Sequence, residues 1–330
     1  MRRAGRMSVV IPVFNSARSL ALCLEALAQS TVHPLECIVV DDGSTDDSAA
    51  VASQYGATLV RMAVRSGPAR ARNLGVAHAT GDLILFLDSD VRVHPDALSR
   101  ILSHFERASD LDAVIGAYDD SPASPPFISQ YRNLLHCFTH RSGRRHASTF
   151  WCGCGAVRRS VFFQSGGLAE RFERPSIEDI EFGARLTAKG GRILLDPRIQ
   201  VQHLKRWTFL NMLRTDIFDR GIPWTRLILR DRSMPNDLNV RGSQRASAAA
   251  SALLLAMTCL GHRSAALVCA VVCIALNAAF YQFLAERRGA LFALRAAPLH
   301  VLFFLYSGVA FVLGAVAHVM SPFPFHRGTQ

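Results

Sequence analysis

The C-terminal third of the chain is the feature that most restricts the fold. Residues 246–320 are mostly Ala, Leu, Val, Phe and Cys, and their ionisable residues are almost confined to two short breaks. Lipid offers no hydrogen-bond partner to a peptide backbone, so a spanning segment needs about 20 apolar residues in a helix. The composition predicts about three transmembrane helices, at residues 246–261, 264–285 and 298–320. The alternative is a buried helical hairpin in a soluble domain.

Basic residues near these segments predict the side of the membrane on which the rest of the chain lies. The break at residues 286–295 contains Arg287, Arg288 and Arg295, and short basic loops stay on the cytoplasmic side. Three spans would put this break and the N-terminal part on the same side, so we expect the N-terminal part to face the cytoplasm. The start of the chain is not expected to act as a secretion signal, because its apolar run is short and contains Pro12.

The chain is strongly basic, with a formal net charge of +11. Much of the excess lies in Arg-rich stretches beside the predicted membrane region, including residues 141–145 and 205–232. Such a surface attracts anionic lipid headgroups and phosphate-bearing substrates. Nucleic acid is not an expected partner, because the sequence contains no motif for its recognition.

The N-terminal half alternates between predicted strands and predicted helices. Apolar runs predict strands at residues 9–13, 37–40, 58–61 and 83–87, with helices between them at residues 17–28, about 46–54, and 69–77. This alternation predicts an α/β fold with a mostly parallel sheet covered on both faces. Ligands of such sheets bind at the carboxyl ends of the strands. The polar residues at those ends are Asn15, Asp41, Asp42, Asp88 and Asp90.

Two carboxylates, Asp88 and Asp90, directly follow the apolar strand in LILFLDSDVRVHPDAL. Their mutual repulsion would be relieved by a divalent cation. A cation that also bound a diphosphate would neutralise the charge that develops as a nucleoside diphosphate leaves. The alternative is an Asx turn that caps the helix beginning near Pro95.

A second group of acceptors lies in VVDDGSTDDS. Its side chains can meet a base edge or a ribose hydroxyl at the mouth of the sheet. An ordinary strand, turn and helix cap would explain most of these residues, but not the second carboxylate, Asp42, beside Asp41.

Five segments together resemble family 2 glycosyltransferases, in the order found in that family. They are VVIPVFNSARSLALCLEAL, VVDDGSTDDS, RSGPARARNLGVAHATGDLILFLDSD, GCGAVRRSVFFQSGGLAERF and IEDIEFGARL. The resemblance covers roughly residues 8–205. It implies a catalytic domain with a GT-A type fold over residues 1–205. An amphipathic interfacial segment at residues 206–245 and the transmembrane region at residues 246–330 would follow.

The resemblance implies a binding site for the nucleotide of a nucleotide-sugar donor. Pro12, Asn15 and Asp42 match positions that frame the base in this family. Arg72 lies in the ARN segment that lines the nucleotide pocket, and Asp88 is expected near the ribose and diphosphate.

The resemblance also implies a metal site and a catalytic base. Asp90 is the expected direct ligand of Mn²⁺ or Mg²⁺, and His203 would complete the site, although a lone His is more often structural. Asp179 matches the usual base, which takes the proton of the acceptor hydroxyl during the attack, with Glu178 in a possible supporting role. The alternative for this acidic pair is a solvated first turn of a helix at residues 178–189.

The expected function is inverting, metal-dependent transfer of a sugar from a nucleotide-diphosphate donor to a lipid or lipid-linked acceptor at the cytoplasmic membrane face. Processive members of the family carry Q-x-x-R-W after the base, whereas HLKRWTFLNML here lacks the Gln, so we expect one sugar per encounter. One alternative is a polyprenyl phosphate as the acceptor. The other is a non-catalytic membrane protein that binds a nucleotide-sugar.

Overall fold

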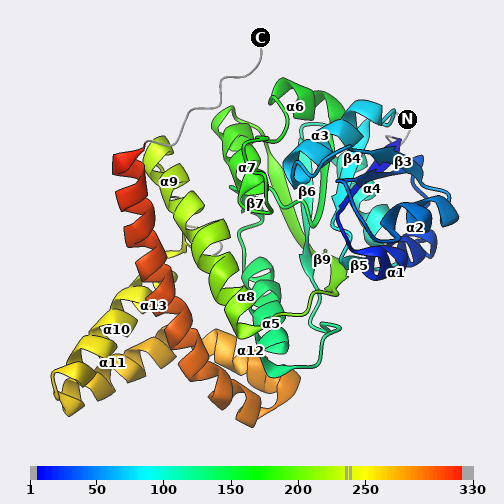
Figure 1. The fold of residues 1–330 in the computed structure, drawn as a ribbon. Helices are drawn as coiled ribbons and strands as arrows, with labels where there is room; N and C mark the ends of the chain where they lie inside the picture. Colours follow the sequence, from blue (N-terminus) through cyan, green and yellow to red (C-terminus); the bar gives the residue numbers. More distant parts are fainter. Residues whose placement is uncertain (1–5, 235–236, 238–239, 322–330) are drawn as a thin grey trace. The chain divides into compact units, whose positions relative to one another are not determined.

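The computed structural model describes residues 6–234, 237 and 240–321 (Figure 1). Contacts divide the described chain into two compact units. The sheet unit comprises residues 6–125 and 143–206, and the helical unit comprises residues 126–142 together with the described residues from 207 to 321. The helical unit thus includes a segment from inside the predicted 1–205 domain. The predicted domain boundaries themselves stay predictions.

The sheet unit contains a nine-stranded mixed sheet among its described residues. The strands are β1 (Met7–Val13), β2 (Glu36–Asp41), β3 (Thr58–Arg61), β4 (Leu83–Leu87), β5 (Val91–Val93), β6 (Ala113–Tyr118), β7 (His146–Ala147), β8 (Cys154–Arg158) and β9 (Ile193–His203). The order is β3-β2-β1-β4-β8-β6-β9-β5, and β7 pairs with β9. The pairs among β1 to β4 and the pair of β6 with β9 are parallel, whereas β5, β7 and β8 pair antiparallel. The predicted α/β fold with a mostly parallel sheet is confirmed.

Helices pack against this sheet through close contacts (Figure 1). They are α1 (Ala17–Ala28), α2 (Ser48–Gln54), α3 (Pro68–His78), α4 (Ala97–Arg107), α6 (Arg159–Gln164) and α7 (Glu178–Ala188). Helix α3 begins with Pro68 after Gly67, whose φ of 94° suits only glycine. On its inner face a Cβ at Gly75 would lie 2.4 Å from Cγ1 of Val10. Glycine therefore lets α3 approach β1 closely, which positions the residues of α3 at the carboxyl end of the sheet.

In the described part of the helical unit, all regular secondary structure is helical. They are α5 (Phe127–Arg141), α8 (Phe209–Arg214), the π-helix η1 (Thr215–Gly221), α9 (Ile222–Asp231), α10 (Gly242–Cys259), α11 (Arg263–Leu276), α12 (Ala278–Arg288) and α13 (Ala290–Met320). Tyr131 of α5, Trp207 and Phe280 of α12 belong to one buried apolar cluster. The segment predicted to lie in the membrane interface thus contains α8, η1 and α9, while residues 235–236 and 238–239 of it fall outside the described residues.

The predicted transmembrane helices are only partly reproduced. Helix α13 is long and apolar enough to cross a membrane, and it begins well before the predicted start at Pro298, which lies inside it. The predicted span at residues 264–285 is not one straight helix: α11 and α12 meet at an angle of 66°. Asn277 lies at this break, where its Nδ2 donates to Oγ of Ser247 and to the carbonyl of Cys273, both at 2.8 Å. By length and composition, the described chain has one such helix, or two if the bent pair counts as one span.

Candidate functional site

The loops after β1 and β2 hold each other at the carboxyl edge of the sheet. Asn15 adopts a left-handed conformation with φ of 47°, which Asn tolerates better than most residues. Its Oδ1 accepts a hydrogen bond from the backbone N–H of Thr45 at 2.8 Å, and its own N–H donates to Oγ of Ser44 at 2.9 Å. Oδ1 of Asp41 accepts from the N–H of Ser44 at 2.8 Å. These bonds fix the shape of the predicted base-binding loops.

Asp42 is buried and orders the loop that precedes α3. Its two carboxylate oxygens accept hydrogen bonds from the N–H groups of Ser66 and Gly67, at 2.7 and 2.9 Å. Pro12 lies half-buried in β1, paired in register with Val40 of β2. The structure therefore gives Asp42 a definite local role, and the predicted contacts of Pro12 and Asp42 with a base stay predictions.

Arg72 joins two acidic segments that lie far apart in the sequence. Its guanidinium is buried on α3 and donates from Nη2 to Oδ1 of Asp88 at 2.6 Å and from Nη1 to Oε1 of Glu178 at 2.9 Å. A buried guanidinium with two carboxylate partners is well compensated, while either carboxylate alone would be costly. The D-x-D segment and the E-D pair thus meet at one place, which supports the sequence prediction that both belong to one site.

Asp179 and its neighbour Glu178 differ in the groups that donate hydrogen bonds to their carboxylates. Glu178 accepts from Arg72 and, at 2.9 Å, from the N–H of Ser176. Among the described residues, the carboxylate of Asp179 accepts hydrogen bonds from two backbone N–H groups, those of Cys152 at 3.2 Å and Ile180 at 2.8 Å. Burial, and then the charge of Glu178, raise the pKa of Asp179 to about 7, against the opposing effect of Arg72. Asp179 is therefore a carboxyl group that can gain or lose a proton near neutral pH.

Asp90, directly before β5, lies close to His203, the last residue of the neighbouring strand β9. β5 runs antiparallel to β9 with Val91 opposite His203, and this register puts Nε2 of His203 3.7 Å from Oδ2 of Asp90. The imidazole is buried and stacks on Tyr118, with ring centroids 4.3 Å apart. Burial by itself would raise the pKa of Asp90, but the hydrogen bond and charge of His203, with Lys205, hold that pKa below its usual value.

The structure brings together the two predicted metal ligands, Asp90 and His203. Within the described ranges, no group of three or more His, Cys, Asp and Glu residues is placed to hold a metal ion. Asp88, the other acid of the D-x-D segment, is engaged by Arg72. Two side chains, Asp90 and His203, thus remain as the protein ligands that the sequence predicted.

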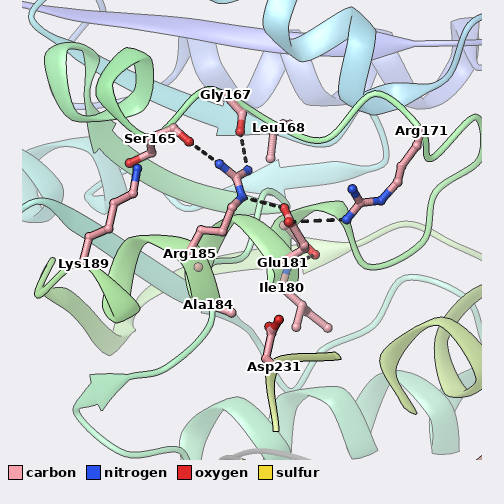
Figure 2. A network of polar contacts seen from close by, with 12 residues as sticks. Ser165, Gly167, Leu168, Arg171, Ile180, Glu181, Ala184, Arg185, Lys189 and Asp231 are labelled. Carbon is pink, nitrogen blue, oxygen red and sulfur yellow. Dashed lines mark hydrogen bonds and ion pairs between the residues drawn. The ribbon is translucent and has the colours of Figure 1, made fainter. Parts of the chain in front are cut away.

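A buried ion-pair network holds α7, and the sequence did not predict it (Figure 2). Oε2 of Glu181 accepts from Nε of Arg185 at 2.9 Å, and Oε1 accepts from Nη2 of Arg171 at 3.4 Å. Arg185 also donates to the carbonyls of Ser165 and Gly167, the latter at 2.6 Å. Glu181 is 0% exposed, so a solvated acidic first turn is the wrong description of α7. The spacing of Glu181 and Arg185 by four residues was the one available signal.

Comparison with known proteins identifies a family for part of the chain. Residues 8–165 match the family model "Glycosyl transferase family 2". The chain carries a family 2 glycosyltransferase domain. The match includes the strands β1 to β8 except for Met7, and it contains Arg72, Asp88 and Asp90, while α7 and His203 follow it.

Two relatives share this family 2 region. "Glycosyltransferase GlyG" of Streptococcus pneumoniae serotype 4 is 33% identical over 117 residues, which cover 34% of this chain and 38% of that protein. "Undecaprenyl-phosphate 4-deoxy-4-formamido-L-arabinose transferase" of Serratia proteamaculans is 29% identical over 165 residues, which cover 47% of this chain and 50% of that protein. The chain thus spans half or less of the length of these two relatives.

A solved structure resembles nearly the whole chain. It is the mannosyltransferase PcManGT from Pyrobaculum calidifontis in complex with GDP-Man and Mn²⁺. The two chains superpose with a TM-score of 0.63 at 19% identity, over 96% of this chain and 88% of the other. At this identity the likeness shows the fold, so the predicted GT-A type fold is confirmed.

Proposed function

We propose that this chain is a glycosyltransferase that takes a sugar from a nucleotide-diphosphate donor bound at the carboxyl edge of its sheet. One observation carries the proposal: Arg72 and Asp88, which lie within the residues that match family 2, meet Glu178, the neighbour of Asp179. Open α/β sheets bind ligands at this edge. In the proposed function, Pro12, Asn15 and Asp42 form the base-binding side of the donor site.

Asp179 is the proposed catalytic base. The reaction needs a group that takes the proton of the acceptor hydroxyl as its oxygen attacks the anomeric carbon, and a base works best with a pKa near the working pH. The raised pKa of Asp179 meets this requirement, whereas the carboxylate of Glu178 is held by a guanidinium. One base and one displacement give inversion at the anomeric carbon.

Asp90 and His203 are the proposed protein ligands of a divalent metal. They fit such an ion: an anionic oxygen and a ring nitrogen lie 3.7 Å apart, and this mixed donor set suits Mn²⁺ and is tolerable to Mg²⁺. When bound, the metal supplies positive charge that stabilises the leaving nucleoside diphosphate. Asp88 is proposed to lie near the ribose and diphosphate, with Arg72 holding its carboxylate in place.

The proposed acceptor is a lipid or a lipid-linked sugar at the cytoplasmic membrane face. Helix α13 is apolar and long enough to span a bilayer, and the amphipathic segment at residues 206–245 is proposed to lie in the interface. A polyprenyl phosphate is the second candidate, because one relative carries undecaprenyl phosphate in its name.

Donor binding tests the proposal directly. The purified full-length chain would be titrated with UDP-, GDP- and dTDP-sugars, with Mn²⁺ and with a chelator. We expect one nucleotide class to bind, and to bind more tightly with the metal. If none bound under either condition, the proposed function would be wrong. With the right donor, mild acid separates the acceptors, because a sugar linked through a phosphodiester is released and an ordinary glycoside is not.

A further inference from the structure

A cavity lies inside the helical unit, among η1, α9, α10 and α13. Its volume is about 370 Å³, which falls within the range of small-molecule binding sites. Trp224 and Ile228 of α9 and Phe303, Phe304 and Phe311 of α13 form an apolar wall. In Figure 1, α9 and α13 run beside each other within this unit. The wall is suited to an apolar chain.

One end of the cavity contains a buried arginine that is not fully satisfied. Arg132 of α5 is 3% exposed and forms an ion pair with Asp216. The second carboxylate oxygen of Asp216 accepts from the hydroxyl of Tyr306 at 2.7 Å. Nε of Arg132 has no hydrogen-bond partner within the described residues. Buried polar groups usually have a partner, so this N–H is available to an acceptor in the cavity.

Two further arginines bring uncompensated positive charge to the same cavity. Nη1 of Arg220 lies 3.1 Å from Nε2 of His136, and Nη1 of Arg245 lies 3.0 Å from Sδ of Met234. In the described part of the chain, neither guanidinium has a carboxylate partner. Among the described residues that line the cavity, Asp216 is the one carboxylate, and Arg132 already neutralises it. The cavity therefore carries an excess of about two positive charges.

Gly308 of α13 leaves room in the cavity for an apolar ligand chain. A Cβ at Gly308, which lines the cavity, would meet no atom within 4 Å. Less than two turns further along the same helix, a Cβ at Gly314 would lie 2.6 Å from Cβ of Thr225 in α9. The two helices thus touch at Gly314, whereas next to Gly308 there is room for a ligand.

We propose that this cavity binds a lipid monophosphate, that is, a single apolar chain that ends in a phosphate monoester. A monoester carries between one and two negative charges at neutral pH, which matches the excess charge of Arg220 and Arg245. Guanidinium groups also bind phosphate through paired hydrogen bonds. A phosphodiester headgroup carries one negative charge and therefore matches this excess less well.

The lipid chain lies along the apolar wall and continues into the bilayer. Helix α13 supplies much of that wall and has the length and composition of a membrane span. This inference rests on the proposed function, because it selects the second candidate, a polyprenyl phosphate, as the acceptor. With that acceptor, the proton that Asp179 takes is the remaining acid proton of the monoester. Its test measures lipid binding and not transfer, so the two can fail separately.

Titration calorimetry tests the site with the full-length chain in phosphatidylcholine nanodiscs and farnesyl phosphate as the probe. The double variant Arg220→Gln/Arg245→Gln should bind at least about tenfold more weakly, because each arginine loses a charge-assisted hydrogen bond. Gly308→Phe should weaken binding to a similar extent by filling the open space. Arg263→Gln is the matched control: it removes one positive charge from the start of α11, outside the cavity, and should leave the affinity unchanged.

Competing ligands complete the test on the unchanged protein. Farnesol, inorganic phosphate and phosphatidylglycerol should each compete far more weakly than farnesyl phosphate. Farnesol has no phosphate, inorganic phosphate has no chain, and phosphatidylglycerol lacks the second charge. Equal competition by phosphatidylglycerol would overturn the monophosphate assignment, and unchanged affinity in both cavity variants would overturn the site. The thermal unfolding transition of each variant in the same nanodiscs serves as the check on folding. If the double variant fails this check, the exposed Arg245→Gln alone must still lower the affinity for the proposal to stand.

Discussion

The site at the sheet edge and the cavity in the helical unit carry an excess of opposite charge. At the sheet edge, acidic groups outnumber basic ones, and one buried guanidinium, Arg72, serves both Asp88 and Glu178. In the cavity, arginines outnumber carboxylates, and the walls are apolar. An acidic site needs a cation before it can accept a diphosphate, whereas a basic site can accept a phosphate directly. The comparison teaches that the two proposed phosphate sites would differ in their ionic requirements.

Replacing the proposed base should have the largest effect, and it tests whether the chemistry belongs to the sheet edge. Asp179→Asn should lower the rate of sugar transfer by roughly 10²–10⁴-fold, because the amide cannot take the proton of the acceptor hydroxyl. Donor affinity should stay nearly unchanged. The test measures turnover and nucleotide affinity for Asp179→Asn and Glu178→Gln side by side. A larger loss of turnover in Glu178→Gln than in Asp179→Asn would contradict the assignment.

Removing a proposed metal ligand should separate the two phosphate sites. Asp90→Ala should weaken Mn²⁺-dependent donor binding by roughly 10–100-fold, while leaving the binding of farnesyl phosphate unchanged. Calorimetry with Mn²⁺ and with a chelator checks this. Asp82→Ala is the control, because Asp82 is an exposed residue that precedes the opposite end of β4. If the donor affinity of Asp90→Ala kept its full metal dependence, the metal assignment would have to be dropped.

The pH dependence of transfer should follow Asp179. Its pKa is raised to about 7, and the protonated carboxyl cannot act as a base, so activity should fall as the pH falls through this value. From pH 8 to pH 6, kcat/KM should decrease by about tenfold. The residual activity of Asp179→Asn should lack this step. A wild-type profile that is flat between pH 6 and 8 would argue against this base.

Alanine substitutions at two glycines of α13 should have the smallest effects, and these effects concern the stability of the protein. Gly308→Ala should stabilise the protein by about 1 kcal/mol, because alanine favours a helix and the added methyl meets open space. Gly314→Ala should destabilise it by about 1–3 kcal/mol, because the methyl would collide with Thr225. Thermal unfolding in detergent compares them. The same sign for both variants would mean that α9 and α13 do not diverge next to Gly308.

The sequence predicted the sheet and the edge at which polar groups gather, because those signals are local. Apolar runs mark buried strands, and Asp88 and Asp90 directly follow one of them. The sequence did not predict that Arg72 contacts Glu178, because this contact joins residues 106 positions apart and depends on how α3 and α7 pack. The pairing of Asp90 with His203 was expected only through the family resemblance, since the register of β5 with β9 cannot be read from either strand alone.

The helical unit was less predictable for a physical reason. Apolar composition predicted helices but could not distinguish one straight span from two segments that meet at Asn277, where side-chain hydrogen bonds stabilise the break. The cavity was not predicted either. It depends on the absence of a side chain at Gly308 and on the spatial meeting of arginines from α5, η1 and α10.

The position of α5 in the chain has a consequence for biosynthesis. This helix is translated between two parts of the sheet unit, yet Tyr131 packs in the same cluster as Phe280 of α12, which emerges from the ribosome about 150 residues later. Domains generally fold as units during synthesis, but α5 has to wait until α12 has been made. Its apolar face is therefore exposed while the residues between α5 and α12 are synthesised. A chain that stops before α12 should keep that face exposed and should depend on chaperones or aggregate.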